Sequence, residues 1–174
     1  MNIFVIGGGA REHSIIWSLK KSNNCGDIFC SPGNAGIEKL ASCHNLDFND
    51  RNSIIGFCNE NNIELIIIGP EEFLEKGLSD FFMEKGIKVF GPSKKATQLE
   101  SSKIFSKNFL LKNKIPTAFS IDFVNYKLAL EYIESANFPL VIKADGLAAG
   151  KGVIICENKK KSQILFSNRL MLKL

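Results

Sequence analysis

The stretch IFVIGGGAREHSIIWSLK, residues 3–20, decides the fold class of this chain. Ile3–Ile6 is a short apolar run that breaks directly into three glycines, a pattern typical of a buried strand ending in a tight turn. After the turn, apolar residues recur on one helical face, which predicts a helix over about residues 13–20. Strand, glycine turn and helix together form the opening unit of a parallel α/β sheet.

The same alternation continues to about residue 100. Short apolar runs predict further strands at Ile28–Cys30, Ile63–Ile68 and Ile87–Phe90. Helices are expected between them, one at about 52–61 capped by Asn52 or Ser53 and one at about 74–84. Residues 1–100 are therefore predicted to form a Rossmann-like domain of α/β class, with a parallel sheet and helices on both faces.

The rhythm changes in the second part of the chain, residues 101–157. A helix is expected to begin at Ser101 or Ser102 and to end before Pro116, followed by a strand near 118–123 and a helix near 126–135. Leu140–Ile142 and Val153–Cys156 then flank a glycine-rich loop, and strand, loop, strand predicts a hairpin. The elements of this second domain look incomplete.

The last residues, 158–174, carry no clear helix caps and end within an apolar run. We expect them to be a tail that a truncation or a shifted reading frame has produced. The run Lys159–Lys161 is interpreted as a solvated segment.

Composition narrows the class of protein. The 174 residues carry a formal net charge of +4, which is weaker than the concentrated positive charge of a nucleic-acid binder. No run approaches the roughly 18 apolar residues of a membrane span, and no secretory signal opens the chain. The five cysteines form no CxxC pair, which favours a reducing cytoplasm and gives no metal site. We expect a cytoplasmic protein with neither a nucleic-acid nor a membrane partner.

Three turns that follow predicted strands form the first candidate site. In an open parallel sheet these turns meet at one edge, where ligands bind. Glycines let backbone N–H groups approach a phosphate, and an arginine can bind phosphate or carboxylate in a fork. The alternative is that Gly, Pro and Asn only make the turns, and that a lone histidine is structural. The candidate residues are Gly7, Gly8, Gly9, Arg11, Glu12, His13, Gly33, Asn34, Gly36, Gly69, Pro70 and Glu71.

A nicotinamide dinucleotide is a weak candidate ligand for this site. The third glycine of the dinucleotide fingerprint is replaced by Glu12, and no acidic residue ends the second predicted strand to hold a ribose.

The glycine loop Gly146–Gly152 is the second candidate site. Only three residues separate Gly146 from Gly150–Lys151, Gly152 stands where a P-loop has Ser or Thr, and a strand follows, so this is no P-loop. Such a loop can still cover nucleotide phosphates, with Lys143 and Lys151 balancing their charge. The alternative is an ordinary hairpin loop. Taken alone, Lys103 is interpreted as a solvated lysine at a helix start.

Five stretches then carry a resemblance to a known family. VIGGGAREHSI, SPGNAG, IIIGPEEFLEKGL, VFGPSKKATQLESSKIFSKNFL and PLVIKADGLAAGKGVII occur in this order. Together they closely resemble the N-terminal part of the phosphoribosylamine–glycine ligase family, also called glycinamide ribonucleotide synthetase, within the ATP-grasp superfamily. The resemblance runs from Met1 to about Glu157, and the second part of the chain would then be the beginning of an ATP-grasp domain.

The resemblance implies an activity and assigns the residues. Members of the family join glycine to 5-phosphoribosylamine with ATP and Mg²⁺ or Mn²⁺, and give glycinamide ribonucleotide, ADP and phosphate in purine biosynthesis. The three turns would bind the sugar phosphate, Lys103 and Lys143 would contact ATP phosphates, and the loop would close over the triphosphate. The loop residues in question are Gly146, Gly150, Lys151 and Gly152.

Full members of the family are much longer than this chain. The metal ligands, the adenine-binding hinge and most of the glycine site are expected in the part that is missing here. We therefore expect no ligase turnover from this chain alone. The alternative is a non-catalytic Rossmann-like remnant that binds a sugar phosphate weakly.

Overall fold

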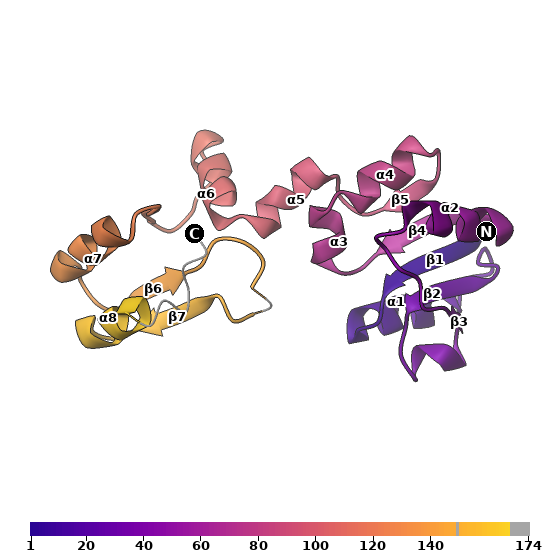
Figure 1. Cartoon of the computed structure of the whole chain (residues 1–174), viewed down its shortest axis with the longest axis horizontal. Coiled ribbons are helices and arrows are strands. Elements are labelled where there is room, and N and C mark those ends of the chain that lie inside the picture. The colour runs from indigo at the N-terminus through magenta and orange to yellow at the C-terminus, as the bar shows by residue number, and fades with distance from the viewer. Residues whose placement is uncertain (149, 168–174) are drawn as a thin grey trace. The chain divides into compact units, whose positions relative to one another are not determined.

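The computed structural model describes residues 1–148 and 150–167. The chain divides into two compact units, the first of which is Met1–Thr97 and the second of which begins at Gln98 (Figure 1).

A parallel five-stranded sheet forms the centre of the first unit, in the order β3-β2-β1-β4-β5. The apolar run after Asn2 becomes the central strand, in which Phe4, Val5 and Ile6 are fully buried. The predicted α/β class with a parallel sheet is confirmed. The strands are β1 (Asn2–Gly7), β2 (Ile28–Pro32), β3 (Ser42–Cys43), β4 (Ile63–Ile68) and β5 (Lys88–Phe90).

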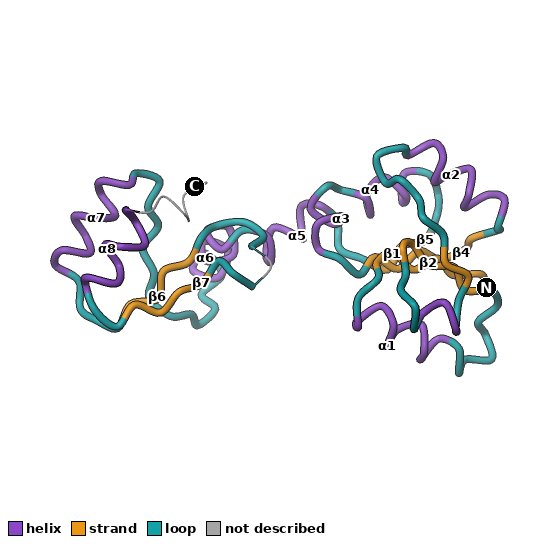
Figure 2. Tube along the Cα trace, turned by 60° about the horizontal axis from the view of Figure 1, so that its bottom comes forward, coloured by secondary structure: helices purple, strands orange, loops and turns teal. Residues whose placement is uncertain are grey.

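Helices cover both faces of this sheet, with α1 on one side and α2 on the other (Figure 2). On the first side, Ile16 of α1 packs in a cluster with Val5 and Ile67. On the second side, Ile54 and Phe82 pack with Phe4 in another cluster. The helical segments of this part of the chain are α1 (Ala10–Leu19), the short 3₁₀ helix η1 (Ile37–Lys39), α2 (Arg51–Glu60), α3 (Glu71–Glu75), α4 (Leu78–Glu84) and α5 (Lys94–Ser101), which crosses into the second unit.

Two details of the predicted helices are wrong. The cap of α2 is Asp50 and not Asn52 or Ser53, because the Asp50 carboxylate accepts the backbone N–H of Ser53 at 3.0 Å. The single helix predicted over 74–84 is broken into α3 and α4 at Gly77. Gly77 has a φ of +79°, a left-handed conformation that interrupts a helix and that glycine adopts at low cost.

The second unit contains three helices and an antiparallel hairpin among its described residues. Leu140 lies opposite Cys156 and Lys143 opposite Val153, so the predicted hairpin is confirmed. The helix that begins after Ser102 and the helix over 126–135 are confirmed as well. The elements are α6 (Lys103–Lys112), α7 (Tyr126–Ser135), β6 (Leu140–Lys143), β7 (Val153–Cys156) and α8 (Lys159–Ser167).

The prediction of a strand near 118–123 is wrong. The segment is irregular, and no strand of the described part of the second unit pairs with it. Its apolar side chains are open to solvent instead, with Phe119 84% and Ile121 44% exposed. An alternation of apolar residues cannot make a strand without a neighbour that supplies the ladder hydrogen bonds.

The prediction that residues 158–174 lack helix caps is also wrong for the residues of this segment that the structure describes. Helix α8 begins there, capped by the Asn158 side chain, which accepts the backbone N–H of Lys161 at 3.0 Å. Glu134 of α7 accepts a hydrogen bond from Gln163 at 2.7 Å and forms an ion pair with Lys159. Residues 168–174 lie outside the described residues. No helix in the described part of the chain is long and apolar enough to span a membrane.

Candidate functional site

The turns after β1, β2 and β4 approach one another so closely that only glycine fits at several positions. A Cβ built on Gly8 would lie 2.5 Å from the carbonyl oxygen of Gly33. One on Gly7 would lie 2.9 Å from the ring of Pro70, and one on Gly36 would lie 2.7 Å from the imidazole of His13. The glycines therefore allow three loops to meet at the carboxyl edge of the sheet, where an α/β sheet binds ligands.

Glu12 is the centre of this cluster. Its side chain is only 4% exposed, and its Oε2 accepts the backbone N–H of Gly9 at 2.6 Å. A Cβ on Gly69 would lie 1.9 Å from Glu12 Oε1, so the carboxylate fills the space that this glycine leaves open. A carboxylate thus already occupies the N-terminus of α1, where a dinucleotide fold places the pyrophosphate. This arrangement adds a physical reason to set the nicotinamide interpretation aside.

Asn34 fastens the second turn to the first. Its Nδ2 donates to the carbonyl oxygen of Gly8 at 2.8 Å, while its Oδ1 accepts the backbone N–H groups of Gly36 and Ile37 at 2.8 and 3.0 Å. Both lone pairs of this amide oxygen therefore accept hydrogen bonds from within the turn. In this structure Asn34 therefore shapes the loop.

Arg11 and Glu71 place charge at the edge of the cluster. Arg11 Nη2 donates to Glu71 Oε1 at 2.9 Å, and Arg11 Nε lies 3.6 Å from Glu12 Oε1. The pKa of Glu71 is lowered by hydrogen bonds from its own backbone N–H and from the Arg11 guanidinium. Glu71 is therefore ionised at neutral pH, and the side chain of Arg11 is 56% exposed beside it.

All the residues proposed for this first site come together in the structure. Contacts or hydrogen bonds link each of them to at least one other member of the set, across the three turns. The members are Gly7, Gly8, Gly9, Arg11, Glu12, His13, Gly33, Asn34, Gly36, Gly69, Pro70 and Glu71.

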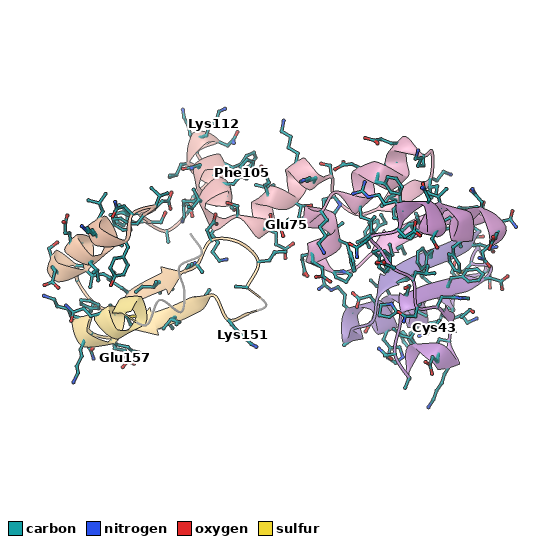
Figure 3. The ribbon with its side chains drawn as sticks, viewed as in Figure 1. Cys43, Glu75, Phe105, Lys112, Lys151 and Glu157 are labelled. Atoms are coloured by element: carbon teal, nitrogen blue, oxygen red, sulfur yellow. The ribbon has the colours of Figure 1, made fainter. Side chains whose placement is uncertain are left out.

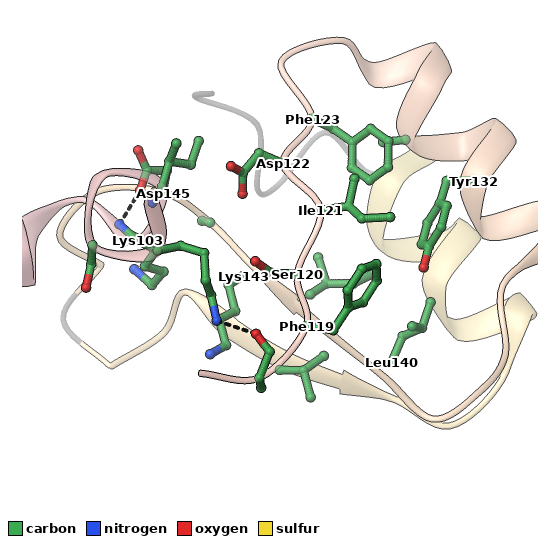
Figure 4. Close-up of a pocket in the computed structure, with 18 of the residues that line it drawn as sticks. Lys103, Phe119, Ser120, Ile121, Asp122, Phe123, Tyr132, Leu140, Lys143 and Asp145 are labelled. Atoms are coloured by element: carbon green, nitrogen blue, oxygen red, sulfur yellow. Dashed lines mark hydrogen bonds between the residues drawn. The ribbon is translucent and has the colours of Figure 1, made fainter. Parts of the chain in front are cut away.

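A pocket of about 690 Å³ lies in the second unit, between α6, the segment 118–123, α7 and β6. One end carries the charged side chains of Lys103, Lys143 and Asp145. The other end is apolar and includes Phe123 and Tyr132 (Figure 4). This volume lies in the range of small-molecule sites, roughly 300–1,000 Å³.

Asp145 connects the glycine loop to the beginning of α6. Its carboxylate accepts hydrogen bonds from the Ser102 hydroxyl at 3.0 Å and from the backbone N–H groups of Lys103 and Ile104. Burial alone raises the pKa of Asp145, but the bonds from the Ile104 N–H, the Ser102 hydroxyl and the Lys103 N–H outweigh it and lower the pKa. The carboxylate is thus an ionised cap at a helix N-terminus, where negative charge is favoured.

Lys103 reaches from α6 to the loop. Its ammonium donates to the carbonyl oxygen of Gly146 at 2.9 Å. Lys103 and Lys143 therefore line the charged end of the pocket, and Gly146, which follows Asp145 in the chain, contacts the Lys103 ammonium.

None of the described residues from Gly146 to Gly152 lines the pocket. These residues include Gly150, Lys151 and Gly152, and Lys151 projects from the loop (Figure 3). The loop is closed by hydrogen bonds from Ala144 N–H to Gly152 O and from Lys151 N–H to Ala148 O, both 2.8 Å long. Ala149 lies outside the described residues.

Three residues that build this second site were not predicted as site residues, although Ser102 was predicted as a helix start. They are Asp145, Ser102 and Lys107. The Lys107 ammonium donates to Thr117 Oγ1 at 2.6 Å and to the carbonyl oxygen of Ala118 at 2.7 Å. It thereby ties the segment 118–123 to α6 as one wall of the pocket. Two of the three carried a signal, because Asp145 directly precedes the glycine loop and Lys107 follows Lys103 by one helical turn.

The described residues do not offer a metal centre. Among residues 1–148 and 150–167, no three His, Cys, Asp or Glu side chains gather so that they could hold a metal ion. We derive no chemical step through a metal from this chain.

Comparison with known proteins finds two family models that match the chain. The family model "Phosphoribosylglycinamide synthetase, N domain" matches residues 1–100, and the model of the ATP-grasp (A) domain of the same enzyme matches residues 101–172. The second match includes most of the segment 158–174, which we expected to lie outside the family resemblance.

Individual relatives show how much of the enzyme this chain corresponds to. A phosphoribosylamine–glycine ligase of Clostridium acetobutylicum is 45% identical over 163 residues, which are 94% of this chain and 39% of the relative. A bifunctional purine biosynthetic protein of Dictyostelium discoideum is 45% identical over 162 residues, which are 92% of this chain and 20% of that protein. The chain thus spans less than half the length of these relatives.

Solved structures also match nearly the whole of this chain and less than half of their own length. The phosphoribosylamine–glycine ligase of Thermotoga maritima matches with a TM-score of 0.74 and 32% identity, over 93% of this chain and 37% of that chain. A biotin carboxylase domain of Hydrogenobacter thermophilus, solved with ADP and magnesium, matches with a TM-score of 0.73 and 19% identity, over 96% of this chain and 40% of that chain. The latter likeness shows the fold alone. Because the two family models together account for nearly the whole sequence, the chain belongs to the phosphoribosylglycinamide synthetase (phosphoribosylamine–glycine ligase) family.

Proposed function

We propose that this chain forms the sugar-phosphate site and the phosphate-facing wall of the ATP site of a phosphoribosylamine–glycine ligase. The reaction activates the glycine carboxylate as an acyl phosphate at the expense of ATP. The amine of 5-phosphoribosylamine then displaces the phosphate and forms the amide of glycinamide ribonucleotide. A cytoplasmic location belongs to the same proposal.

The proposed binding of ATP rests on the contact between Lys103 and the glycine loop. Its ammonium is held on the Gly146 carbonyl, and Lys143 lines the same end of the pocket. Two cations beside a glycine loop are suited to a polyphosphate, because an oxyanion attracts ammonium groups and the loop backbone can approach it closely.

Phosphoryl transfer needs positive charge on the transferred group, since charge spreads over its oxygens in the transition state. Lys103 and Lys143 would supply charge from one side. Bound ATP would supply the phosphoryl group, and Mg²⁺ or Mn²⁺ would be held by residues other than those described here. The remaining loop residues proposed for ATP, Gly150, Lys151 and Gly152, would then have to move toward the phosphates.

The sugar phosphate is assigned to the three turns of the first unit. The exposed Arg11 guanidinium is the main proposed phosphate contact, and it can exchange part of its pairing with Glu71 for phosphate oxygens. Gly33 and Gly69 would keep the turns packed closely beside this contact, because Cys43 Sγ and the Glu12 carboxylate fill the space that the two glycines leave.

Nucleotide binding tests the first half of the proposal. Calorimetry with ADP should show binding by the intact chain, and Lys103→Ala and Lys143→Ala should each weaken it by about 1.5–3 kcal/mol, the range for hydrogen bonds to charged groups. Lys112→Ala is the matched control, because Lys112 is the last residue of α6 (Figure 3) and does not line the pocket. No binding of ADP, or equal losses in all three variants, would contradict the assignment.

A binding module without catalysis is the second candidate. It is favoured by the two buried clusters of the first unit, which give its sheet a core on both faces without residues from the second unit. Binding of ribose 5-phosphate in the absence of any ADP binding would favour this candidate over a ligase.

A further inference from the structure

Cys30 and Cys43 form a thiol pair at the edge of the first unit's sheet. They are direct partners in the parallel register of β2 and β3. Neighbouring strands lie about 4.8 Å apart, which falls within the Cα separation of roughly 4.4–6.8 Å that a disulfide spans. Directly paired residues also point to the same face of a sheet. Backbone geometry therefore places these two side chains within bonding reach.

The sulfur atoms converge on the space that Gly33 leaves open. A Cβ built on Gly33 would lie 2.4 Å from Cys43 Sγ and 3.7 Å from Cys30 Sγ. Gly33 has a φ of +76°, and its missing side chain is what makes room for the Cys43 sulfur. Both sulfurs thus adjoin the turn after β2. This contact is independent of the ligands assigned to that turn.

The two thiols differ in access. Cys30 is fully buried, and its Sγ donates to the carbonyl oxygen of Gly7 at 3.2 Å. Cys43 is only partly buried and stands on the edge strand (Figure 3). A reagent from solution therefore meets Cys43 first, and Cys30 lies behind it.

We propose that Cys30 and Cys43 are an oxidisable pair, which closes to an intramolecular disulfide on reaction with a low-molecular-weight disulfide. The Cys43 thiolate attacks one sulfur of the reagent, forms a mixed disulfide and releases one small thiolate. Cys30 loses its proton and attacks Cys43 Sγ, which expels the second small thiol. Two protein thiols and one small disulfide become one protein disulfide and two small thiols, so two electrons pass from the protein to the reagent.

The reaction should be slow at neutral pH and fast in mild alkali. Burial, followed by the proximity of Cys43 and Glu12, raises the pKa of Cys30 to about 12, and burial raises the pKa of Cys43 as well. Only the thiolate attacks a disulfide, and its fraction grows about tenfold for each pH unit below the pKa. We expect the rate to rise steeply between pH 7 and pH 9.

Mass spectrometry of the native chain tests the proposal. The chain is incubated with hydroxyethyl disulfide, quenched in acid, alkylated and cleaved before Asp27 and after Lys39, which puts Cys25, Cys30 and Cys43 on three separate peptides. We expect the peptide of Cys30 joined to that of Cys43. Cys43 that remains a stable mixed disulfide, a link from either residue to Cys25 or Cys58, or no reaction of Cys43 would overturn the proposal.

Variants separate the two steps. Cys43→Ser should abolish the link, while Cys30→Ser should leave Cys43 trapped as the mixed disulfide. Cys58→Ser is the matched control, because Cys58 is buried, with its pKa raised to about 11 by burial, yet belongs to the cluster on the other face of the sheet; it should leave the link intact. If Cys30→Ser fails to fold, the wild-type chain in urea replaces it: unfolded chains should give mixed pairings that include Cys25, and an unchanged pattern there would refute a role for the fold.

Discussion

Gly69 has less room for a side chain than any other glycine of the chain, because a Cβ there would meet Glu12 Oε1 at 1.9 Å. The Glu12 carboxylate thus determines which residue can stand at position 69. In the second unit, the Asp145 carboxylate orders the start of α6.

Gly69→Ala should destabilise the chain by about 1–3 kcal/mol, the usual cost of forcing a methyl group into a packed site. Gly56→Ala is the control, because Gly56 lies inside α2 with nothing within 4 Å of its Cβ position. It should stabilise the chain by about 0.5–1 kcal/mol through helix propensity. Urea unfolding of the two variants measures both changes in the free energy of unfolding. If both variants were stabilised, or both destabilised, the predicted difference between the two positions would be wrong.

Arg11→Ala should weaken the binding of ribose 5-phosphate by about 1.5–3 kcal/mol. Arg51→Ala removes the same charge from α2, where the guanidinium lies 4.7 Å from the ring centroid of Phe81, and it should leave binding unchanged. Calorimetry compares the two variants. Similar losses would mean that only net charge attracts the ligand, and no loss in either would remove Arg11 from the site.

Asp145→Asn should cost about 1–2 kcal/mol of stability in the second unit at neutral pH, because the charged acceptor is lost. The lowered pKa of Asp145 fixes the pH dependence. Its contribution is present above the unfolded value of about 3.9 and disappears as the pH falls through the lower folded pKa. Unfolding curves of wild type and variant should therefore converge in strong acid. A difference that persists there would assign the effect to packing instead.

The helices of the first unit depend on caps and breaks that are set by one side chain each. Asp50 caps α2, and Gly77 separates α3 from α4. The centre of the sheet needs no such device, because Ile3–Ile6 of β1 are apolar and buried.

Asp50→Ala should lower stability by about 1 kcal/mol through the loss of the cap on α2. Asn52→Ala, two residues further on at an exposed position of the first turn, should change stability by less than about 0.5 kcal/mol. Thermal unfolding of the two variants distinguishes the positions. A larger loss in Asn52→Ala would restore the cap that the sequence pattern predicted.

The chain as a whole is expected to unfold in two parts. Among the described residues, both buried apolar clusters lie within the unit Met1–Thr97, whereas the second unit exposes apolar side chains such as Phe119 and Val124. Burial of apolar area is the main driving force of folding, so the first unit should be the more stable one.

A chain that ends at Thr97 should fold by itself and show one cooperative thermal transition. The amides of Ile63–Ile68, the strand beside the centre of the sheet, should be protected from hydrogen exchange. A gradual melt without protected amides in β4 would show that the first unit depends on the second.

The sequence predicts local features of this molecule better than distant ones. The longer strands of the first unit and the glycine turns were predictable because each is a continuous pattern, whereas the two-residue strand β3 was missed and the apolar alternation near 118–123 predicted a strand that does not form. The break at Gly77 was missed because apolar residues keep helical spacing across it, and the cap at Asp50 was missed because Asn52 and Ser53 are capping residues as well. The position of Asp145 before the glycine loop is visible in the sequence, but its role as a cap of α6 is not, since its hydrogen-bond donors lie 41 to 43 residues earlier in the chain.

The packing of Glu12 against Gly7, Gly9 and Gly69 has a consequence for how this loop can change by mutation. A methyl group at Gly69 collides with the Glu12 carboxylate, and removal of that carboxylate alone leaves the Gly9 N–H without its partner. In a double-mutant cycle, Glu12→Ala and Gly69→Ala should therefore cost less together than the sum of the single changes. Substitutions at these positions are thus coupled, and a tolerated change at one of them should need a compensating change at another.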